Sequence, residues 1–163
     1  MERVFIGIDP GLAGGIAVLG EDGEVLDVTK MPGTPLDILY YLERWKEKDV
    51  VCVLEDVGHG MPGQSSSATA KFARHVGHLE MALLALGYMT TTVTPQKWQK
   101  TFQLGKSSEH SKTEWKNKLK AKAQQLFPSL GKKITLATSD ALLLAFYGMH
   151  KQTVAKSTKS TKR

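Results

Sequence analysis

Apolar residues in the first part of the chain fall in short runs that turn residues separate. Residues 4–8 are almost wholly apolar and end at Asp9, directly before a Pro-Gly pair. This pattern predicts a buried central strand whose C-terminal end opens into a turn. Residues 14–20 and 24–30 flank a short glycine-containing turn and predict two further strands. We therefore expect the first three strands to form an antiparallel meander.

Residues 50–55 form another apolar run, which ends in Glu55. A run without alternation indicates burial on both faces, as in a central strand that pairs in parallel with its neighbours. Upstream, Pro35 begins a predicted helix over residues 35–48, because proline costs little in a first helical turn. Its apolar face is expected to contain Leu36, Leu39 and Tyr40, with Leu42 as a further candidate.

Helix and strand patterns alternate in the rest of the chain. We predict an amphipathic helix over residues 67–87, a β-branched strand over 88–94, a short helix from Pro95, a lysine-striped helix over 113–127 and an apolar helix over 139–150. Thr138 or Ser139 is expected to cap the last helix. This order of elements predicts an α/β fold, in which an antiparallel meander joins parallel strands and helices flank the mixed sheet.

The chain of 163 residues is long enough for one sizeable core, and the usual size of domains argues against two. We expect a single domain over residues 1–150. Residues 151–163 contain four Lys and one Arg without an acid. This basic tail is expected to be disordered, because it can bury too little apolar surface to offset the entropy of ordering.

No signal for export or membrane insertion is evident. The N-terminal residues lack a basic leader, and no apolar stretch approaches the length of a membrane span. We therefore expect an intracellular protein of the cytoplasm or nucleoid, or one encoded by a virus. Cys52 is the single cysteine, which excludes an intrachain disulfide, and its apolar neighbours predict a place in the core.

Charge divides the chain into an acidic and a basic part. Residues 1–56 carry five basic and twelve acidic side chains, whereas residues 94–133 carry ten lysines and two glutamates. The ordinary interpretation of a lysine-rich stretch is a solvated helix face. Beside an acidic part that contains candidate metal ligands, the basic part instead favours binding to nucleic acid.

Three acids could form such a metal site. Asp9 and Glu55 end predicted strands, and Asp140 lies in the first turn of the last predicted helix. If they converge, hard cations such as Mg²⁺ or Mn²⁺ would offset the repulsion between their carboxylates. Such a site predicts phosphodiester hydrolysis with two ions, bridged by Asp9. Taken singly, each acid also has a structural interpretation, as a turn former, a strand terminator or a favourable charge at a helix N-terminus.

Several segments resemble the RuvC family of Holliday-junction resolvases. The segments GIDPG, VLED and SDALLLAFYG occur in the order typical of that family, and MPGQSSSATAKFARHVGHLEMAL and TPQKWQKTF resemble its phage-type and chloroplast-type branch. The resemblance covers nearly the whole chain. It implies a ribonuclease-H-like fold, a homodimer that presents two active sites to a four-way DNA junction, dependence on Mg²⁺ or Mn²⁺, and paired symmetric nicks in recombination and repair.

The resemblance places the metal ligands on Asp9, Glu55 and Asp140. The family usually has another Asp or His three or four residues before the last acid, where this chain has Ala137 and Leu136. Candidates for the missing ligand are Asp56, Thr138, Ser139 and water, although Asp56 would face the opposite side of a regular strand. A weakened nuclease, or a protein that binds branched DNA without cutting it, is therefore an alternative.

The resemblance also suggests residues that contact DNA. Phosphate contacts need Lys or Arg, and the corresponding positions are Arg74, Lys97, Lys100, Lys106 and Lys112. Lys112 matches a family lysine in the loop before the lysine-rich helix, where it could steady the scissile phosphate or be a solvated charge. His59 and Gln64 lie in the loop that family members insert into the junction centre. The aromatic wedge of some family members is absent there, so flaps and other branched DNA are alternative substrates.

Three further expectations concern larger features. The helix over residues 67–87 is apolar across a broad face, and the resemblance implies a dimer contact there. Trp98 and Trp115 could stack on bases, but their helical spacing favours the core. The actin-like ATPase fold begins with a similar strand and hairpin, but a chain of 163 residues lacks room for its second domain.

Overall fold

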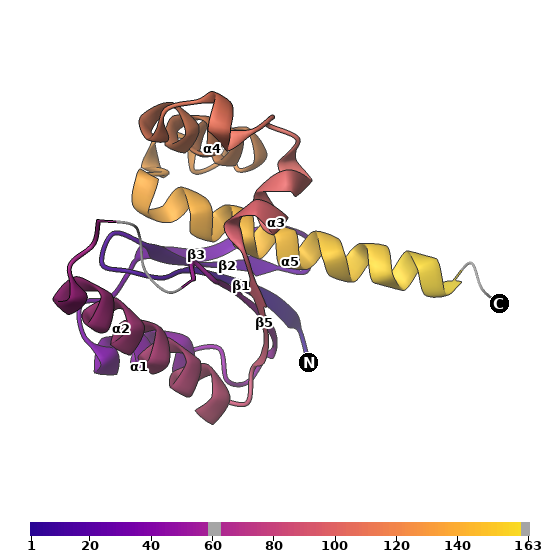
Figure 1. Cartoon of the computed structure of the whole chain (residues 1–163). Helices are drawn as coiled ribbons and strands as arrows, with labels where there is room; N and C mark the ends of the chain where they lie inside the picture. The colour runs from indigo at the N-terminus through magenta and orange to yellow at the C-terminus, as the bar shows by residue number, and fades with distance from the viewer. Residues whose placement is uncertain (59–62, 161–163) are drawn as a thin grey trace.

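The computed structural model describes residues 1–58 and 63–160 (Figure 1). Five strands form one mixed sheet in the order β3-β2-β1-β4-β5. Their bounds are Arg3–Asp9 for β1, Gly15–Gly20 for β2, Val25–Lys30 for β3, Asp49–Glu55 for β4 and Met89–Val93 for β5. Strands β1, β2 and β3 pair antiparallel, whereas β4 pairs in parallel with β1 and β5. The predicted meander and the central parallel strand are confirmed.

Helices cover both faces of the sheet. Their bounds are Pro35–Glu43 for α1, Ser66–Ala85 for α2, Pro95–Gln99 for α3, Lys112–Leu126 for α4 and Leu136–Ser160 for α5, with short 3-10 helices at Lys100–Phe102 (η1), Ser107–Glu109 (η2) and Gly131–Lys133 (η3). Figure 1 shows α1 and α2 on one face and α5 on the other, with α4 beyond it. Each face has its own buried apolar cluster, because successive strand residues point to opposite sides. The predicted α/β fold with a mixed sheet and flanking helices is confirmed.

Helix α1 differs from its prediction in length and in its buried face. It ends at Glu43, and its buried residues are Ile38 and Leu42. Leu36 and Tyr40, which were expected in the core, are 54% and 57% exposed. The segment carries two overlapping apolar stripes at helical spacing, and packing against α2 selects the one that includes Ile38. Sequence periodicity alone could not choose between the two stripes.

Helix α5 lies directly against the backbone of the sheet. A Cβ atom added to Gly7 of β1 would lie 2.1 Å from the carbonyl oxygen of Ala141 and 2.3 Å from the amide nitrogen of Ala145. A Cβ atom on Gly15 of β2 would lie 2.5 Å from the carbonyl oxygen of Ala137. Only glycine permits so close an approach of a helix backbone to a strand. The two glycines therefore set the position of the first turns of α5 on the sheet.

The start of α5 corrects the predicted cap. The helix begins at Leu136, and the amide of Ser139 already donates to the carbonyl oxygen of Thr135 at 2.9 Å. Thr138 lies inside the first turn, where its hydroxyl accepts a hydrogen bond from the Thr135 amide at 3.1 Å. Thr138 and Ser139 thus both lie within the helix and are not its cap. Asp140 consequently lies in the second turn of the helix, not in the first.

Helix α5 continues to Ser160, through most of the segment that was expected to be a disordered basic tail. The ammonium of Lys151 lies 5.5 Å from the ring centre of Tyr147, and Lys156 approaches Glu21 at 3.5 Å. Extending a packed helix costs much less than starting a new one. Residues 161–163 of the predicted tail lie outside the described part of the chain.

Strand β4 contains the single cysteine. Cys52 is fully buried and unpaired, as predicted. The start of the strand is tied to β1 by an ion pair of 2.6 Å between Arg3 and Asp49. Over the described residues, none of the helices combines the length and the apolar character needed to cross a bilayer.

Candidate active site

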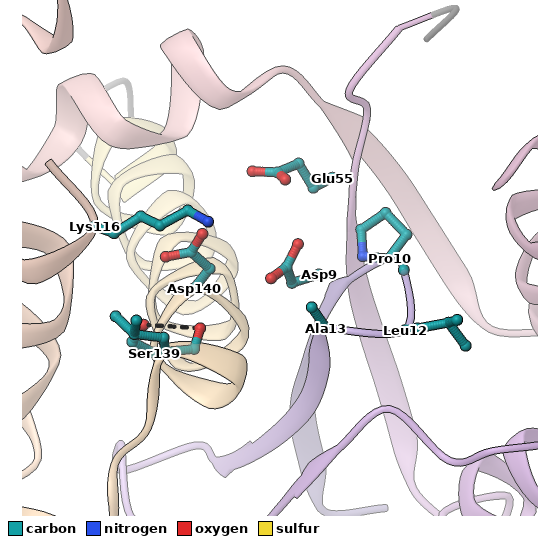
Figure 2. A pocket seen from close by; sticks show the side chains of 11 residues that line it. Asp9, Pro10, Leu12, Ala13, Glu55, Lys116, Ser139 and Asp140 are labelled. Carbon is teal, nitrogen blue, oxygen red and sulfur yellow. Dashed lines mark hydrogen bonds between the residues drawn. The ribbon is translucent and has the colours of Figure 1, made fainter. Parts of the chain in front are cut away.

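Three carboxylates from distant parts of the sequence line one cavity of about 360 Å³ (Figure 2). The parallel register pairs Ile8 of β1 with Leu54 of β4. The acids that follow these two residues, Asp9 and Glu55, therefore emerge at the same edge of the sheet. Asp140 reaches the cavity from α5, because the helix packs closely on β1. The structure thus brings together the three acids that the sequence analysis singled out.

The loop after β1 forms another wall of this cavity. Residues 10–14 line it, and the amide of Gly14 donates to the carbonyl oxygen of Gly11 at 3.0 Å. Gly11 has a φ of 110°, a backbone conformation that favours glycine. The turn predicted at the Pro-Gly pair is therefore confirmed. Leu12 lies at the tip of the loop and is 89% exposed. The tight loop leaves one side of the cavity accessible to solvent.

Asp9 has the most perturbed electrostatic environment of the three acids. Burial, followed by the charges of Asp140 and Glu55, raises its pKa to about 9, against the charge of Lys116, which lowers it. Removing a carboxylate from water disfavours its charged form, and neighbouring negative charges add to that effect. Asp9 therefore holds a proton at neutral pH unless a cation enters the cavity.

The other two acids show smaller effects of the same sign. Burial raises the pKa of Glu55 to about 7, against a hydrogen bond from Trp98 that lowers it. Burial raises the pKa of Asp140 to about 6, against the charge of Lys116. A cluster of buried acids with raised pKa values is typical of sites that bind cations or transfer protons. A positive charge in the cavity would stabilise the ionised form of all three acids.

Lys116 is a site residue that the sequence analysis missed. It lies in α4 and lines the cavity beside Asp140, as Figure 2 shows. Lys112, the lysine expected near the scissile phosphate, is exposed and does not line the cavity. The helix was predicted to begin at residue 113, but α4 begins at Lys112 and is capped by Ser111. The predicted place of Lys112 in a loop is therefore wrong. Lys112 and Lys116 are one helical turn apart. A helix predicted to begin at Lys112 would therefore have placed both lysines on the same helix face.

Trp98 contributes a second contact that the sequence did not reveal. Its side chain is fully buried, as predicted, but its indole Nε1 donates to Oε2 of Glu55 at 2.5 Å. The other predicted core tryptophan, Trp115, is partly buried against the same cluster and donates to Gln99 at 3.1 Å. Helical spacing predicted burial of Trp98 correctly. It carried no information about which polar group the indole would meet.

The resemblance implies a further acid or histidine three or four residues before Asp140. Among the described residues that line the cavity, no such side chain is present. Leu136 lines the cavity there, 48% exposed, and Ser139 lines it as well. The hydroxyl of Thr138 is engaged by the helix start. Asp56 is exposed and accepts a hydrogen bond from the Gly58 amide at 2.9 Å, outside the cavity. Among the candidates named for the missing ligand, Ser139 is the side chain that reaches the cavity.

The donor set fits a hard, hydrated cation. In the described residues, no group of three His, Cys, Asp or Glu side chains lies close enough to hold one ion together. Zinc sites need such a group, whereas Mg²⁺ keeps several waters and is commonly held by one or two carboxylates together with substrate phosphates. Asp9, Glu55 and Asp140 provide carboxylates for this kind of binding, and their raised pKa values show that positive charge is missing. The residues therefore fit Mg²⁺ or Mn²⁺.

These pKa shifts predict how stability depends on pH without a cation. The ordinary pKa of Asp9 is 3.8 and its folded value is about 9, so between these values the folded state binds more protons than the unfolded state. The contribution is complete below the lower value and is lost as pH rises through the higher one. We expect the melting temperature in EDTA to fall from about pH 6 to about pH 9, and Mg²⁺ to restore it mainly at the alkaline end. Thermal melts at each pH measure this, and a melting temperature that rises over the range would contradict it.

The basic residues expected to contact DNA lie outside the cavity. Five of them are exposed: Arg74 in α2, Lys97 in α3, Lys100 in η1, Lys106 before η2 and Lys112 in α4. Gln64 is exposed just before α2. His59 lies outside the described residues. Lys97, Lys100, Lys106 and Lys112 belong to the α3–α4 region, the side of the sheet from which Lys116 reaches the acids.

The sheet order, the helices on both faces and the acids at one edge define a ribonuclease-H-like α/β fold. Comparison with solved structures specifies it further. The structure titled "T. thermophilus RuvC in complex with Holliday junction substrate" matches with a TM-score of 0.67 and 14% sequence identity, over 92% of this chain and 96% of that one. The structure titled "Thermus thermophilus RuvC structure" matches with a TM-score of 0.63 and 15% identity over the same shares. The chain therefore has a RuvC-like fold, as the resemblance implied.

Sequence comparisons add nothing to this structural likeness. No family model and no curated protein matches the chain. At the identities found, the structural likeness establishes the fold alone. What the site does must therefore be argued from its own residues.

Proposed function

We propose that the chain is a metal-dependent endonuclease that cuts Holliday junctions with paired symmetric nicks. The observation that carries the proposal is the convergence of three carboxylates, one buried and two half-buried, and one lysine on a single cavity. Phosphodiester hydrolysis by carboxylate-bound cations needs this combination of negative ligands and nearby positive charge. The RuvC-like fold supports the proposal, since one similar structure is a RuvC protein in complex with a Holliday junction.

The residues of the cavity have different roles in the proposed reaction. Divalent cations, probed first as Mg²⁺, supply the charge that activates water and steadies the leaving oxygen in such hydrolysis. Asp9, whose carboxyl group is affected by the charges of both Glu55 and Asp140, would be the ligand shared between the ions. Glu55 and Asp140 flank it from β4 and α5. Lys116 faces the same space and can bind the scissile phosphate or the charge that develops on it.

A substitution of Lys116 distinguishes it from the lysine expected at first. We expect Lys116→Gln to lower the rate of cleavage by roughly tenfold to a hundredfold, because a positive charge aimed at developing negative charge is lost. Lys112→Gln, one turn away on the same helix, is the matched control and should weaken DNA binding slightly with little effect on the rate. Single-turnover cleavage at saturating protein separates the two effects. A larger rate loss in Lys112→Gln would assign the catalytic role to Lys112.

A homodimer forms part of the proposal. Helix α2 presents Met81 and Leu84, which are 63% and 74% exposed. Both line a groove between α2 and β5, with Thr90 and Thr92 on its strand side. Exposed apolar side chains that gather on one face are typical of protein interfaces. Pairing through this helix would give the two active sites that paired nicks require, and sedimentation as a monomer at micromolar concentration would argue against it.

A second function is favoured by one observation. Leu136 lines the cavity where the resemblance reserves an acid or a histidine. A site with fewer ligands could bind branched DNA and cut it slowly, or cut flaps and other branches with little discrimination. The proposed nuclease and this weakened alternative predict different outcomes in the same assay.

The assay uses labelled four-way junction, flap, duplex and single-stranded DNA, each with and without Mg²⁺ and then with Mn²⁺. The proposal expects cation-dependent nicks at symmetric positions in the junction, with little cleavage of duplex. Binding of the junction without cleavage under either cation would replace the nuclease by a binding protein. Equal cleavage of flaps and junctions would instead widen the substrate class.

A further inference from the structure

Trp98 is a fully buried aromatic residue that contacts one of the acids of the cavity directly. Its Nε1 donates to Oε2 of Glu55 at 2.5 Å, and its exposed fraction is zero. An indole N–H is a donor only and does not titrate. It can therefore bind a carboxylate oxygen at any working pH, which a histidine or a lysine could not do unchanged.

The backbone places this indole accurately over the end of β4. Strand β5 pairs with β4 so that Val93 lies beside Glu55, and the amide of Asp56 donates to the carbonyl oxygen of Val93 at 2.8 Å. Helix α3 begins two residues after Val93, at Pro95, whose fixed φ suits a first helical residue. The short connection leaves Trp98 one turn into the helix and directed back at Glu55.

Packing holds the ring in that place. The rings of Trp98 and Phe102 meet edge to face, with centroids 6.1 Å apart. Both belong to the buried cluster that α5 forms with the sheet. A ring confined in this way cannot follow a carboxylate that rotates, so the carboxylate must adapt to the ring. The hydrogen bond consequently restrains one oxygen, Oε2, of the Glu55 carboxyl group.

We infer that Trp98 is the positioning residue for Glu55, and that its indole N–H holds one carboxylate oxygen so that the group is oriented to bind a divalent cation. The inference rests on the proposed function, because it assumes that the cavity binds such a cation. Hydrogen bonds that orient ligand carboxylates are commonly worth a factor of about 10 to 100 in metal affinity or activity. Trp98 itself does not touch the cation or the DNA in this role.

The decisive variant is Trp98→Phe, which keeps an aromatic ring and loses the N–H. We expect Mn²⁺ or Mg²⁺ alone, measured by calorimetric titration of the full chain without DNA, to bind roughly tenfold to a hundredfold more weakly. Cleavage should recover in part when the cation concentration is raised. Trp115→Phe is the matched control, because it makes the same change in a tryptophan that packs against the same cluster but donates to Gln99, and its cation affinity should stay within about twofold of the original.

A second measurement needs no disruptive variant. The chain has three tryptophans, so its indole N–H signals in a nitrogen–proton spectrum can be assigned with Trp45→Phe and Trp115→Phe. Titration with Mg²⁺ should shift the Trp98 signal, and Glu55→Gln should reduce that shift. The shift reports the contact even if Trp98→Phe folds poorly.

Failure of the inference can be told apart from failure of the proposed function. If the protein cuts DNA with Mg²⁺ but Trp98→Phe binds Mn²⁺ like the original, or the Trp98 signal ignores Mg²⁺, the positioning role is wrong and the nuclease stands. If the protein cuts no DNA but Mg²⁺ shifts the Trp98 signal through Glu55, the nuclease is wrong and the positioning role stands.

Discussion

Replacing Asp9 by asparagine is expected to abolish cation-dependent cleavage while leaving the fold intact. Asp9 lines the cavity with Glu55 and Asp140 and is affected by the charges of both, so its carboxylate is the proposed shared ligand. Cations at such a site are worth several kcal/mol to the transition state. A loss of about 4 kcal/mol corresponds to roughly a thousandfold in rate. Nicking of a labelled four-way junction with Mg²⁺ measures the loss.

Stability provides the internal control for Asp9→Asn. Burial and the charges of Asp140 and Glu55 raise the pKa of Asp9, so the ionised side chain destabilises the folded state when no cation is present. In EDTA at alkaline pH, the variant should therefore melt at the same temperature as the original protein or above it. A lower melting temperature would mean that the activity was lost through damage to the fold.

Asp56→Asn is the matched substitution at a neighbouring strand end. Asp56 follows Glu55 directly, but it is exposed and accepts a hydrogen bond from Gly58 that asparagine can also accept. We expect this variant to keep its cleavage rate within a few fold. Persistent Mg²⁺-dependent nicking in Asp9→Asn, or equal losses in the two variants, would remove the assignment of the metal site.

The sequence predicted those parts of the site that local patterns determine. Apolar runs located β1 and β4, and because both run in parallel, the acids that follow them had to emerge at one edge. Asp9 and Glu55 could therefore be paired from the hydrophobic pattern alone. Asp140 depended on the way in which a distant helix packs, which no periodicity specifies. Its place followed from the resemblance and not from the pattern.

Contacts between elements explain what the sequence could not predict. The helical spacing of Trp98 indicated burial, but the hydrogen bond to Glu55 depends on the register between β4 and β5. Lys116 was one of ten lysines between residues 94 and 133, and only the packing of α4 brings it to the cavity. Long-range placement of this kind decides function, whereas local propensity carries little of it.

Gly7 allows α5, which carries Asp140, to pack closely on β1. We expect Gly7→Ala to lower both the stability of the protein and its cleavage activity. A Cβ atom there would lie 2.1 Å from one backbone atom of α5 and 2.3 Å from another, and no side-chain rotation can relieve a contact with backbone. Overpacking of a core costs about 1–3 kcal/mol, and this contact lies at or above the upper end. For a chain of this size, about 3 kcal/mol lowers the melting temperature by roughly 6–12 °C. Thermal melts measure the effect.

Cleavage should fall together with stability in Gly7→Ala, because any outward movement of α5 carries Asp140 away from Asp9. Gly77→Ala is the control: Gly77 lies in α2, a Cβ atom there meets nothing within 4 Å, and alanine favours a helix by up to about 1 kcal/mol over glycine. That variant should be as stable as the original or more so, with unchanged cleavage. If Gly7→Ala matched it in both measurements, the close packing of α5 on β1 would not be what places the third carboxylate.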